Sequence, residues 1–282
     1  MIFTQYDDAE RLLERVEPML LAKEAFNGML LGTLYGLRRN PNQIAKPLLA
    51  TVQAGERLAL VAVQTAPKRL LLASELDEPA EAVGRLVHNL PAYHVVERVN
   101  GPTHITLPFG RLWSAERNVS ASIFLDQFVY DLHEVTFPQH VSGRARLADA
   151  ADAEVITEWA ADFSFEALGE RFAGPAVKAA MQDRIKHGYV MLWEDEGAVV
   201  SMAQLTRQLR DGITISLVYT PPHLRGHGYA SAVTAAVSQR GLDLGWQFCT
   251  LFTDATNAVA NKIYQRIGYR KLGSYLAYNF EV

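Results

Sequence analysis

Cysteine is almost absent from this chain of 282 residues, which contains Cys249 alone. A single thiol excludes a disulfide within the chain and any zinc site built on cysteines. Cys249 lies in the apolar run Phe248–Phe252, so we expect a buried, inert thiol rather than a nucleophile. No cluster of histidines and carboxylates has the spacing of metal ligands either, and we expect no metal.

The chain also lacks a strong net charge and any long hydrophobic run. Its 27 Lys and Arg residues against 31 Asp and Glu residues give a formal net charge of −4, which offers no reason to expect nucleic acid or an anionic membrane as a partner. No uninterrupted apolar run reaches the ~18 residues of a membrane span. Residues 1–8 lack the basic start and apolar core of a signal peptide, and we therefore expect a cytoplasmic protein.

Hydrophobic residues make up 49% and charged residues 21% of the sequence, the proportions of a globular protein, and the length allows one large domain or two of ordinary size. Residues 136–143 combine proline, glycine and polar side chains and are the best candidate for a linker. After them the patterns predict a strand, two helices, three antiparallel strands, and then helix, strand, helix and strand. The first half shows much the same order, which suggests a weak internal duplication and domains over residues 1–138 and 139–282.

The expected elements follow from hydrophobic periodicity and from proline and glycine breaks. In the first half we expect two helices within 10–37 that break at Pro18, a loop at 41–47, strands at 48–52, 58–63, 69–73 and 95–99, helices at 78–90 and 111–119, a turn at 100–102, and one or two strands within 123–135. In the second half we expect helices at 149–163, 175–187, 229–241 and 258–267, and strands at 144–147, 189–193, 199–205, 213–219, 246–252 and 274–281.

The stretch that organises the chain is Val218–Ala230, a glycine turn between a strand and a helix. Gly226 and Gly228 have no side chain to block an approaching phosphate or to forbid positive φ. The first N–H groups of the helix and its dipole favour a negative charge at this point, and Arg225 adds a cation with several donors. Spacing alone also fits an ordinary glycine cap, but the context favours an anion-binding loop.

Residues Arg225–Ala230 resemble the acetyl-CoA signature of the GCN5-related N-acetyltransferase (GNAT) family, Arg/Gln-X-X-Gly-X-Gly/Ala entered from a strand. The stretch Thr253–Tyr269 is similar to the family's second signature, with matching residues Asn257, Asn261, Tyr264, Gly268 and Tyr269. The two signatures lie ~30 residues apart in the order that the family shows. The resemblance implies an α+β fold of two GNAT-like α/β domains, each a mostly antiparallel mixed sheet flanked by helices.

This resemblance covers the second half well and the first half only in outline. In the first half, Ser74–Pro79 stands where the loop would be, and it is acidic and contains no glycine. An anionic loop there would repel a pyrophosphate. We therefore interpret the first half as a degenerate copy without cofactor, which walls off the acceptor site or supports the second half. An unrelated α+β domain is the alternative.

The resemblance implies transfer of an acetyl group from the co-substrate acetyl-CoA directly to a primary amine of a small-molecule or amino-acid-like acceptor. The reaction needs a deprotonated amine, donors for the thioester oxyanion and an acid for the leaving thiolate. Backbone N–H groups of Val218 and Tyr219 would be the oxyanion donors, and the backbone of Leu217 and Tyr219 would pair with the pantetheine arm. The expected pyrophosphate ligands are Arg225, Gly226, His227, Gly228, Tyr229 and Ala230.

The second signature implies further roles. Asn257 would bond the pantetheine amides or simply cap its helix, and Asn261 and Tyr264 share one face of that helix. Tyr264 is the expected acid that protonates the thiolate; the alternative is a packed aromatic with its hydroxyl at the pocket wall.

The general base is less well defined, because Thr214–Tyr219 contains no carboxylate where many family members carry a glutamate. Either water relays the proton or the base lies elsewhere. Glu166, with Glu170 near it, lies in the region that borders the acceptor, although solvated charges are the plainer interpretation. His223 and His227 flank the loop and suit phosphate or solvent contacts better than a base.

Two other functions fit parts of the sequence. A non-catalytic acyl-CoA-binding or regulatory module agrees with the missing strand glutamate and the degenerate half, but not with Tyr264. A dinucleotide-binding oxidoreductase would use Gly226 and Gly228, but Ser231 replaces the Gly or Ala of that fingerprint. The acceptor is not encoded in such motifs. The family often forms dimers, which leaves a homodimer among the expected states.

Overall fold

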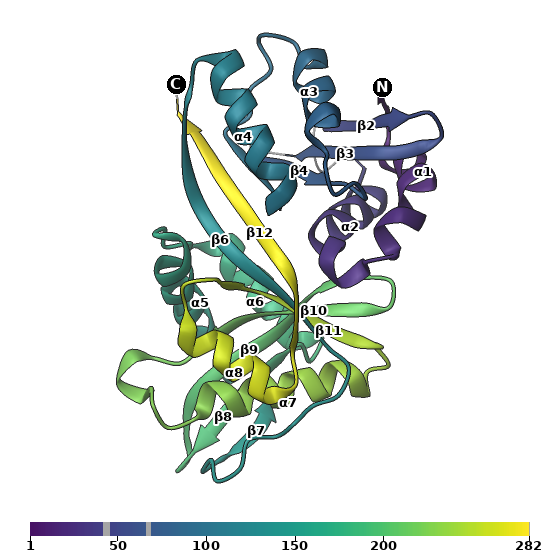
Figure 1. The fold of residues 1–282 in the computed structure, drawn as a ribbon. Helices are drawn as coiled ribbons and strands as arrows, with labels where there is room; N and C mark the ends of the chain where they lie inside the picture. The colour runs from purple at the N-terminus through teal and green to yellow at the C-terminus, as the bar shows by residue number, and fades with distance from the viewer. Residues whose placement is uncertain (42–45, 66–68, 282) are drawn as a thin grey trace. The chain divides into compact units, whose positions relative to one another are not determined.

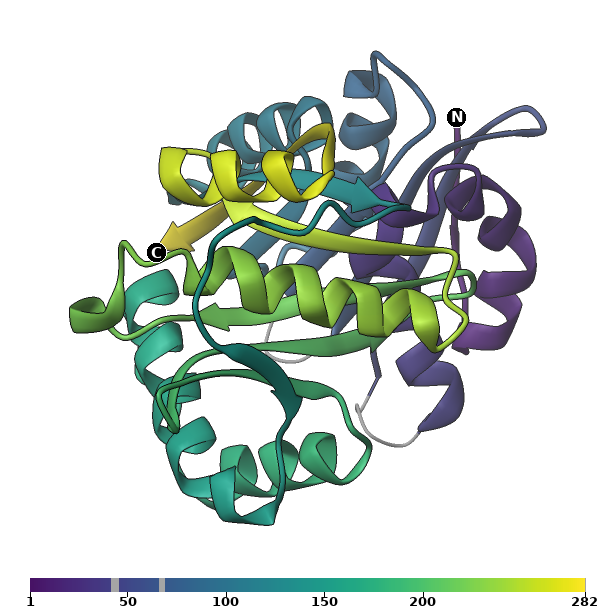
Figure 2. The ribbon, with the colours of Figure 1, turned by 90° about the horizontal axis from the view of Figure 1, so that it is seen from below.

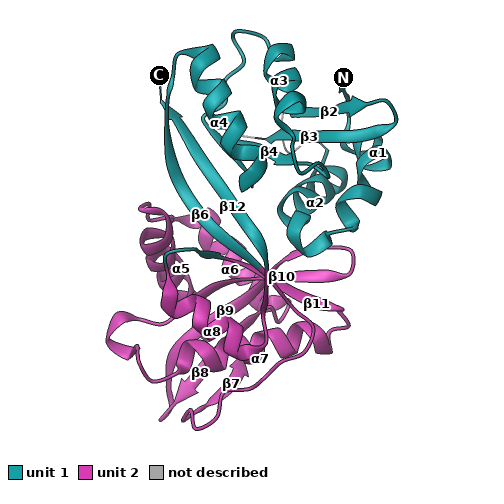
Figure 3. Cartoon of the chain, in the orientation of Figure 1, with its two compact units in different colours: residues 1–129, 253–256, 272–282 teal, residues 130–252, 257–271 magenta. Residues whose placement is uncertain are grey.

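A computed structural model describes residues 1–41, 46–65 and 69–281 (Figure 1). The chain divides into two compact units (Figure 3): unit 1 is formed by residues 1–129, 253–256 and 272–282, and unit 2 by residues 130–252 and 257–271. The expected domains 1–138 and 139–282 stay a prediction, because a division into compact units does not by itself identify domains that fold or function independently. No helix in the described ranges is both long and apolar enough to cross a membrane.

Unit 1 contains the elements of the first half of the chain. They are β1 (Ile2–Gln5), α1 (Ala9–Leu21), α2 (Glu24–Arg39), β2 (Leu48–Ala54), β3 (Arg57–Thr65), β4 (Arg69–Ala73), α3 (Ala80–Asn89), β5 (Arg98–Pro102), α4 (Thr103–Arg117) and most of β6 (Ser120–Leu132). Strands β1 to β4 pair in chain order and antiparallel, and β4 pairs parallel with β5.

Unit 2 repeats this plan. Its elements are β7 (Arg144–Leu147), a short 3-10 helix η1 (Ala150–Asp152), α5 (Ala153–Leu168), α6 (Pro175–Lys186), β8 (Val190–Asp195), β9 (Ala198–Gln208), β10 (Gly212–Tyr219), a second 3-10 helix η2 (Pro222–Leu224), α7 (Tyr229–Asp243), most of β11 (Phe248–Asp254), α8 (Ala258–Ile267) and the start of β12 (Arg270–Glu281). Strands β7 to β10 are antiparallel and β10 pairs parallel with β11. The expected order of elements and the mixed, mostly antiparallel sheet flanked by helices are confirmed.

The duplication is more complete than the sequence indicated. Apart from the two 3-10 helices, the series from β1 to β6 matches the series from β7 to β12 element by element. Strand β1 had not been expected; it is an edge strand of four residues whose Ile2 is exposed, so it carries little hydrophobic pattern.

The last strands of the two repeats are exchanged. In unit 1, β12 pairs antiparallel with β5, from Tyr275 opposite Pro102 to Asn279 opposite Arg98. In unit 2, the end of β6 lies beside β11, where Thr250 Oγ1 donates to the Tyr130 carbonyl at 2.8 Å. Each repeat therefore completes the sheet of the other.

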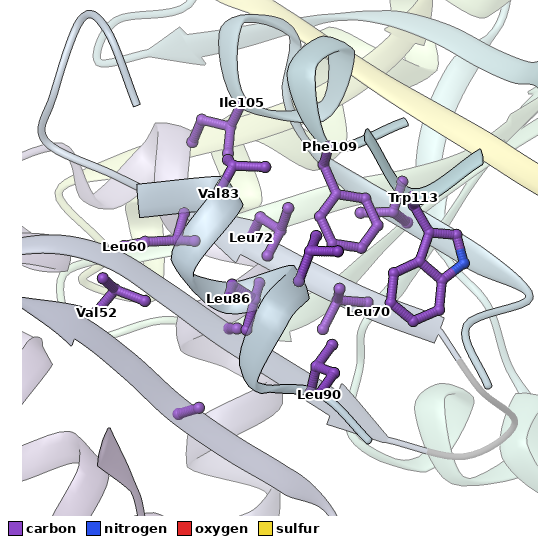
Figure 4. Packing of buried hydrophobic residues seen from close by; sticks show 14 of the residues in the cluster. Val52, Leu60, Leu70, Leu72, Val83, Leu86, Leu90, Ile105, Phe109 and Trp113 are labelled. Carbon is purple, nitrogen blue, oxygen red and sulfur yellow. The ribbon is translucent and has the colours of Figure 1, made fainter. Parts of the chain in front are cut away.

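Each unit has a hydrophobic core between sheet and helices. In unit 1, α3 and α4 cover β2 to β4 (Figure 4), and the rings of Phe109 and Trp113 stack with centroids 5.5 Å apart. In unit 2, α5 and α6 pack against β8 and β9 through Ile156, Ile185 and Leu192. Such side chains each contribute about 1.5–3 kcal/mol when fully buried.

Helix α7 packs along β8, β9 and β10 of unit 2 (Figure 2). A Cβ atom on Gly241 would lie 2.8 Å from Cys249 Sγ, which shows how closely this helix approaches the sheet. Burial raises the pKa of the Cys249 thiol to about 12, so the thiol stays protonated. The expectation of a buried, inert cysteine is confirmed.

Three expectations for the first half are wrong. Helix α1 continues through Pro18, and the two helices separate at residues 22–23, because the buried face of α1 outweighs the cost of an interior proline, about 3 kcal/mol. Residues 100–102 are strand rather than turn: a Cβ on Gly101 would lie 2.7 Å from the Leu72 carbonyl oxygen, so this glycine allows close packing of the strands.

Helix α4 begins at Thr103 rather than at residue 111. The middle of the expected loop at 41–47, residues 42–45, lies outside the described residues.

Candidate active site

Strand β10 separates from its parallel neighbour before it ends. The paired residues of β10 and β11 run from Gly212 to Thr214, while β10 itself continues to Tyr219. Leu217 has a φ of 50°, and the register with β9 shifts between Ser216 and Tyr219. A positive φ in a leucine is a strained conformation that marks a β-bulge. The bulge lies beyond the last residue that pairs with β11, at the backbone predicted to contact the cofactor, while Tyr219 still pairs with Met202 of β9.

The glycine turn follows after η2. Gly226 and Gly228 have φ values of 89° and 85°, which L side chains rarely adopt. No atom lies within 4 Å of a Cβ built on Gly226, so backbone conformation alone calls for glycine there. Gly228 is the N-cap of α7, and the Ala232 N–H donates to its carbonyl at 3.1 Å. The first N–H groups of α7 have no partner within the helix, and with the helix dipole they attract an anion.

Arg225 is held from two sides. Its Nε donates to the Thr220 carbonyl at 2.9 Å, and its Nη2 lies 2.9 and 2.7 Å from the two carboxylate oxygens of Glu166. Both side chains are about half exposed. The expected pyrophosphate ligand and the expected general base therefore form an ion pair with each other, a contact that the sequence did not predict.

The side chain of Tyr219 lies in the candidate site, in addition to the backbone groups predicted to contact the cofactor. Its ring is buried and lies 5.9 Å from that of Trp159 on α5. Burial, followed by the nearby Asp162 and Glu166 carboxylates, raises the pKa of the Tyr219 hydroxyl. The carbonyl of Tyr219 accepts a 3.0 Å hydrogen bond from Ser201 Oγ, which fixes the end of β10 on β9.

The residues of the second signature lie on α8. Asn257 caps this helix, since its Oδ1 accepts from the Ala260 N–H at 3.0 Å. Asn261 is buried; its Nδ2 donates to the Asn257 carbonyl at 2.8 Å, and its Oδ1 accepts from the Tyr130 hydroxyl at 3.0 Å. Both asparagines thus order the helix start, and their contacts with a cofactor remain predictions.

Tyr264 lies between the rings of Tyr130 and Tyr269, with centroids 6.3 and 5.9 Å away. Burial raises its pKa to about 12, so the phenol carries its proton at neutral pH. Within the described residues its hydroxyl makes no hydrogen bond. A neutral hydroxyl that no protein group uses has the properties of a proton donor.

The contacts join the predicted residues into two groups. Arg225 connects the glycine turn to Glu166 and Tyr219, and Asn257, Asn261 and Tyr264 form the second group on α8. Among the described side chains, those of Glu170 and His223 make no hydrogen bond or ion pair.

Sequence reasoning did not identify Trp159, Tyr130 or Asp195 as parts of this region. Trp159 lies in the expected helix 149–163, Tyr130 in the expected strand region 123–135, and Asp195 just after the expected strand 189–193. No local sequence pattern distinguishes these three residues from their neighbours in the same elements, because the residues that they contact are distant in sequence.

Known protein families and solved structures resemble this chain in sequence and fold. Residues 149–279 match the acetyltransferase (GNAT) domain family. Among solved structures, a Drosophila protein is 13% identical with a TM-score of 0.69, covering 99% of this chain and 98% of that one. A GNAT-family acetyltransferase from Colwellia psychrerythraea is 12% identical with a TM-score of 0.58, covering 100% and 99%. A tandem GNAT protein from the clavulanic acid biosynthesis pathway is 12% identical with a TM-score of 0.55, covering 99% and 98%.

At these identities the solved structures show the fold alone, and they show it over the whole chain. No curated protein matches the sequence. The family match places an acyltransferase domain in the second half, on the elements that carry the bulge, the glycine turn and Tyr264. The match therefore assigns residues 149–279 to the acetyltransferase (GNAT) domain family, and the solved structures show the same fold over the whole chain.

Proposed function

We propose that the second half of the chain transfers an acetyl group from acetyl-CoA to a primary amine of a small-molecule or amino-acid-like acceptor. The observation that carries this proposal is the bulge at Leu217 followed by two positive-φ glycines at the start of α7. Beyond Thr214 the edge of β10 no longer pairs with β11 and offers backbone groups to a ligand, and the helix start offers N–H donors for a diphosphate. The residues present therefore suit an acyl-CoA.

The binding roles follow the chain. The backbone of Leu217, Val218 and Tyr219 would pair with the pantetheine arm and donate to the thioester oxygen. Residues 225–230, that is Arg225, Gly226, His227, Gly228, Tyr229 and Ala230, would hold the pyrophosphate. Acetyl-CoA supplies the activated acyl group, and direct transfer to the amine needs no covalent enzyme intermediate.

Proton transfer requires one donor and one acceptor. Tyr264 is the proposed donor to the leaving thiolate, because its raised pKa keeps it protonated and its hydroxyl has no hydrogen-bond partner in the described part of the chain. Glu166 is the proposed acceptor of the amine proton, directly or through water. Its ion pair with Arg225 would have to loosen for this role, since a paired carboxylate is a weaker base.

The first half is proposed to support the second without binding cofactor. The seventh residue of α8 is Tyr264, and the seventh residue of α4 is the buried Phe109, which has no proton to give. No residue in β4 has the positive φ seen at Leu217. Helix α3 starts after Pro79 and a segment with three acidic residues, Glu75, Asp77 and Glu78, which makes a poor site for a phosphate.

A non-catalytic acyl-CoA-binding module is the second candidate. The ion pair between Arg225 and Glu166 favours it, because that contact occupies both an expected ligand and the expected base. A dinucleotide-binding oxidoreductase is disfavoured, since the strands leading to the glycine turn are antiparallel.

Calorimetric titration with acetyl-CoA tests the proposal, with NADH as control ligand and an Arg225→Ala/Gly228→Glu double variant as control protein. Micromolar binding that the variant loses supports both the cofactor and the site. Release of free thiol with a panel of amines then separates an enzyme from a binding module. If the folded wild-type protein does not bind acetyl-CoA, the acetyltransferase proposal is wrong.

A further inference from the structure

The first residue of α7 has a side chain that is anchored outside the glycine turn. Tyr229 is buried, and its hydroxyl donates to Asp195 Oδ2 at 2.5 Å. Asp195 is the last residue of β8, where it pairs with Ala198 across the tight turn formed by Glu196 and Gly197. Both turn residues have positive φ, 50° and 81°, as two-residue hairpins require. Asp195 is therefore presented at a tight hairpin turn, next to a register shift between Trp193 and Glu194.

The same carboxylate oxygen also holds the segment that leads into β7. Ser142 Oγ donates to Asp195 Oδ2 at 2.7 Å, and Trp193 Nε1 donates to the Ser142 carbonyl at 2.7 Å. Next to Ser142, Val141 lies so close to the turn that a Cβ on Gly228 would be 3.0 Å from its Cγ2 atom. Asp195 thus joins the turn at Tyr229 to the segment that packs on Gly228.

The turn is fixed on its other side by a ring contact. The His227 imidazole stacks on the Tyr229 ring, with centroids 5.4 Å apart and planes 21° from parallel. Tyr229 is consequently held between Asp195 and His227, and the backbone from Gly226 to the first turn of α7 follows its position. The hydrogen bonds from Tyr229 and Ser142 lower the pKa of Asp195, which keeps this acceptor charged at neutral pH.

We infer that Asp195 is a positioning residue that fixes the anion-binding turn through Tyr229 and Ser142. Two glycines make the turn conformationally free, and backbone donors bind an anion well only when they are already in place. The contact to the hairpin between β8 and β9 supplies this order. The effect on acyl-CoA affinity rests on the proposed function, whereas the ordering of the turn does not.

Tyr229→Phe is the main test variant, because it removes the hydrogen bond without changing charge or size. Asp195→Asn and Ser142→Ala are the second and third, and the Tyr229→Phe/Asp195→Asn pair closes a double-mutant cycle. Tyr189→Phe is the matched control: it removes a 2.7 Å hydrogen bond between the tyrosine hydroxyl and Gln208 Nε2 in the same unit, away from the turn.

Two measurements separate the inference from the proposed function. Amide hydrogen exchange of the ligand-free protein reports on the order of residues 225–231, and calorimetry reports the Kd of acetyl-CoA. We expect faster exchange in this segment and a Kd raised about tenfold in Tyr229→Phe, the size of a lost hydrogen bond to a charged group. The double variant should add little to either change, and Tyr189→Phe should change neither.

Unchanged exchange at 225–231 in both Tyr229→Phe and Asp195→Asn would overturn the inference. Faster exchange with an unchanged Kd would support the ordering of the turn by Asp195 and overturn its effect on acyl-CoA affinity. If the wild-type protein binds no acetyl-CoA, the proposed function fails, and the exchange data alone decide whether Asp195 positions the turn.

Discussion

Nη2 of Arg225 lies 2.9 and 2.7 Å from the two carboxylate oxygens of Glu166, so the glycine turn and the end of α5 are joined by an ion pair. Both side chains are about half exposed, and such pairs contribute roughly 0–1 kcal/mol to stability. The pair is therefore easily exchanged for other partners. A phosphate that binds Arg225 would release Glu166, and Glu166 would then become available as a base.

Replacement of Glu166 distinguishes a base from a mere partner of Arg225. In Glu166→Gln we expect kcat to fall about 100-fold, the lower range for loss of a general base, with a change in unfolding free energy below about 1 kcal/mol. Glu170→Gln is the matched control, since Glu170 lies in the same segment and has no side-chain partner among the described residues. An unchanged kcat with an altered Kd for acetyl-CoA would show that Glu166 only pairs with Arg225.

Replacement of Tyr264 tests the proposed acid. Tyr264→Phe keeps the packing between Tyr130 and Tyr269 but removes the proton, so we expect kcat to fall at least tenfold while the Kd of acetyl-CoA changes little. Because burial raises the pKa of Tyr264 to about 12, the wild-type rate should show no loss of this acid up to about pH 11. A full kcat in Tyr264→Phe would assign the residue to packing alone.

The glycine turn could be predicted from sequence because positive φ is a local demand that glycine meets best. The order of helices and strands could also be predicted, because hydrophobic periodicity is likewise a local property of the sequence. The ion pair of Arg225 with Glu166 could not be predicted, since the two residues are 59 positions apart and no repeat connects them. Asn100–Pro102 was wrongly expected to be a turn, because the sequence Asn-Gly-Pro is typical of turns. Gly101 is needed instead for its close approach to Leu72, which depends on the tertiary structure.

Three buried groups predict a loss of stability at alkaline pH. Burial raises the pKa of Cys249 and Tyr264 to about 12 each, and that of Tyr269 well above its usual value. In the unfolded chain these groups ionise from about pH 9 to 10 upward. The folded state keeps their protons, so stability is fully present below that range and is lost as pH rises toward the folded pKa values.

Urea midpoints measured from pH 8 to 11 check this expectation. Each group adds a slope of up to about 1.4 kcal/mol per pH unit once the unfolded form has ionised. Cys249→Ala should lower the slope between pH 9 and 11 even if the small cavity lowers stability at every pH. An identical slope in wild type and variant would mean that burial does not raise the pKa of the Cys249 thiol in the folded protein.

Gly226 and Gly55 both have positive φ and offer a matched pair of variants. Gly226 in the site and Gly55 in a hairpin of unit 1 have φ values of 89° and 62°, and a Cβ on either would meet no atom within 4 Å. We expect Gly226→Ala and Gly55→Ala each to lower the unfolding free energy by about 1 kcal/mol, the backbone strain of a left-handed alanine. Only Gly226→Ala should weaken acetyl-CoA binding. Urea unfolding and calorimetry measure the two effects, and equal Kd values would exclude the turn from the binding site.

Because β6 and β12 are exchanged between the two repeats, we expect neither half to be stable as a separate protein. Strand β12 pairs with β5 through residues 275–279, so a fragment of residues 1–138 leaves one edge of β5 without its partner. We expect this fragment alone to aggregate or to lack a cooperative thermal transition, and to become soluble when co-expressed with residues 139–282. Circular dichroism and size-exclusion chromatography measure both outcomes. A variant of the second fragment that ends at residue 269 is the control, because without β12 it should not restore the first. A fragment 1–138 that is monomeric and cooperatively folded by itself would show that β12 is dispensable for the first repeat.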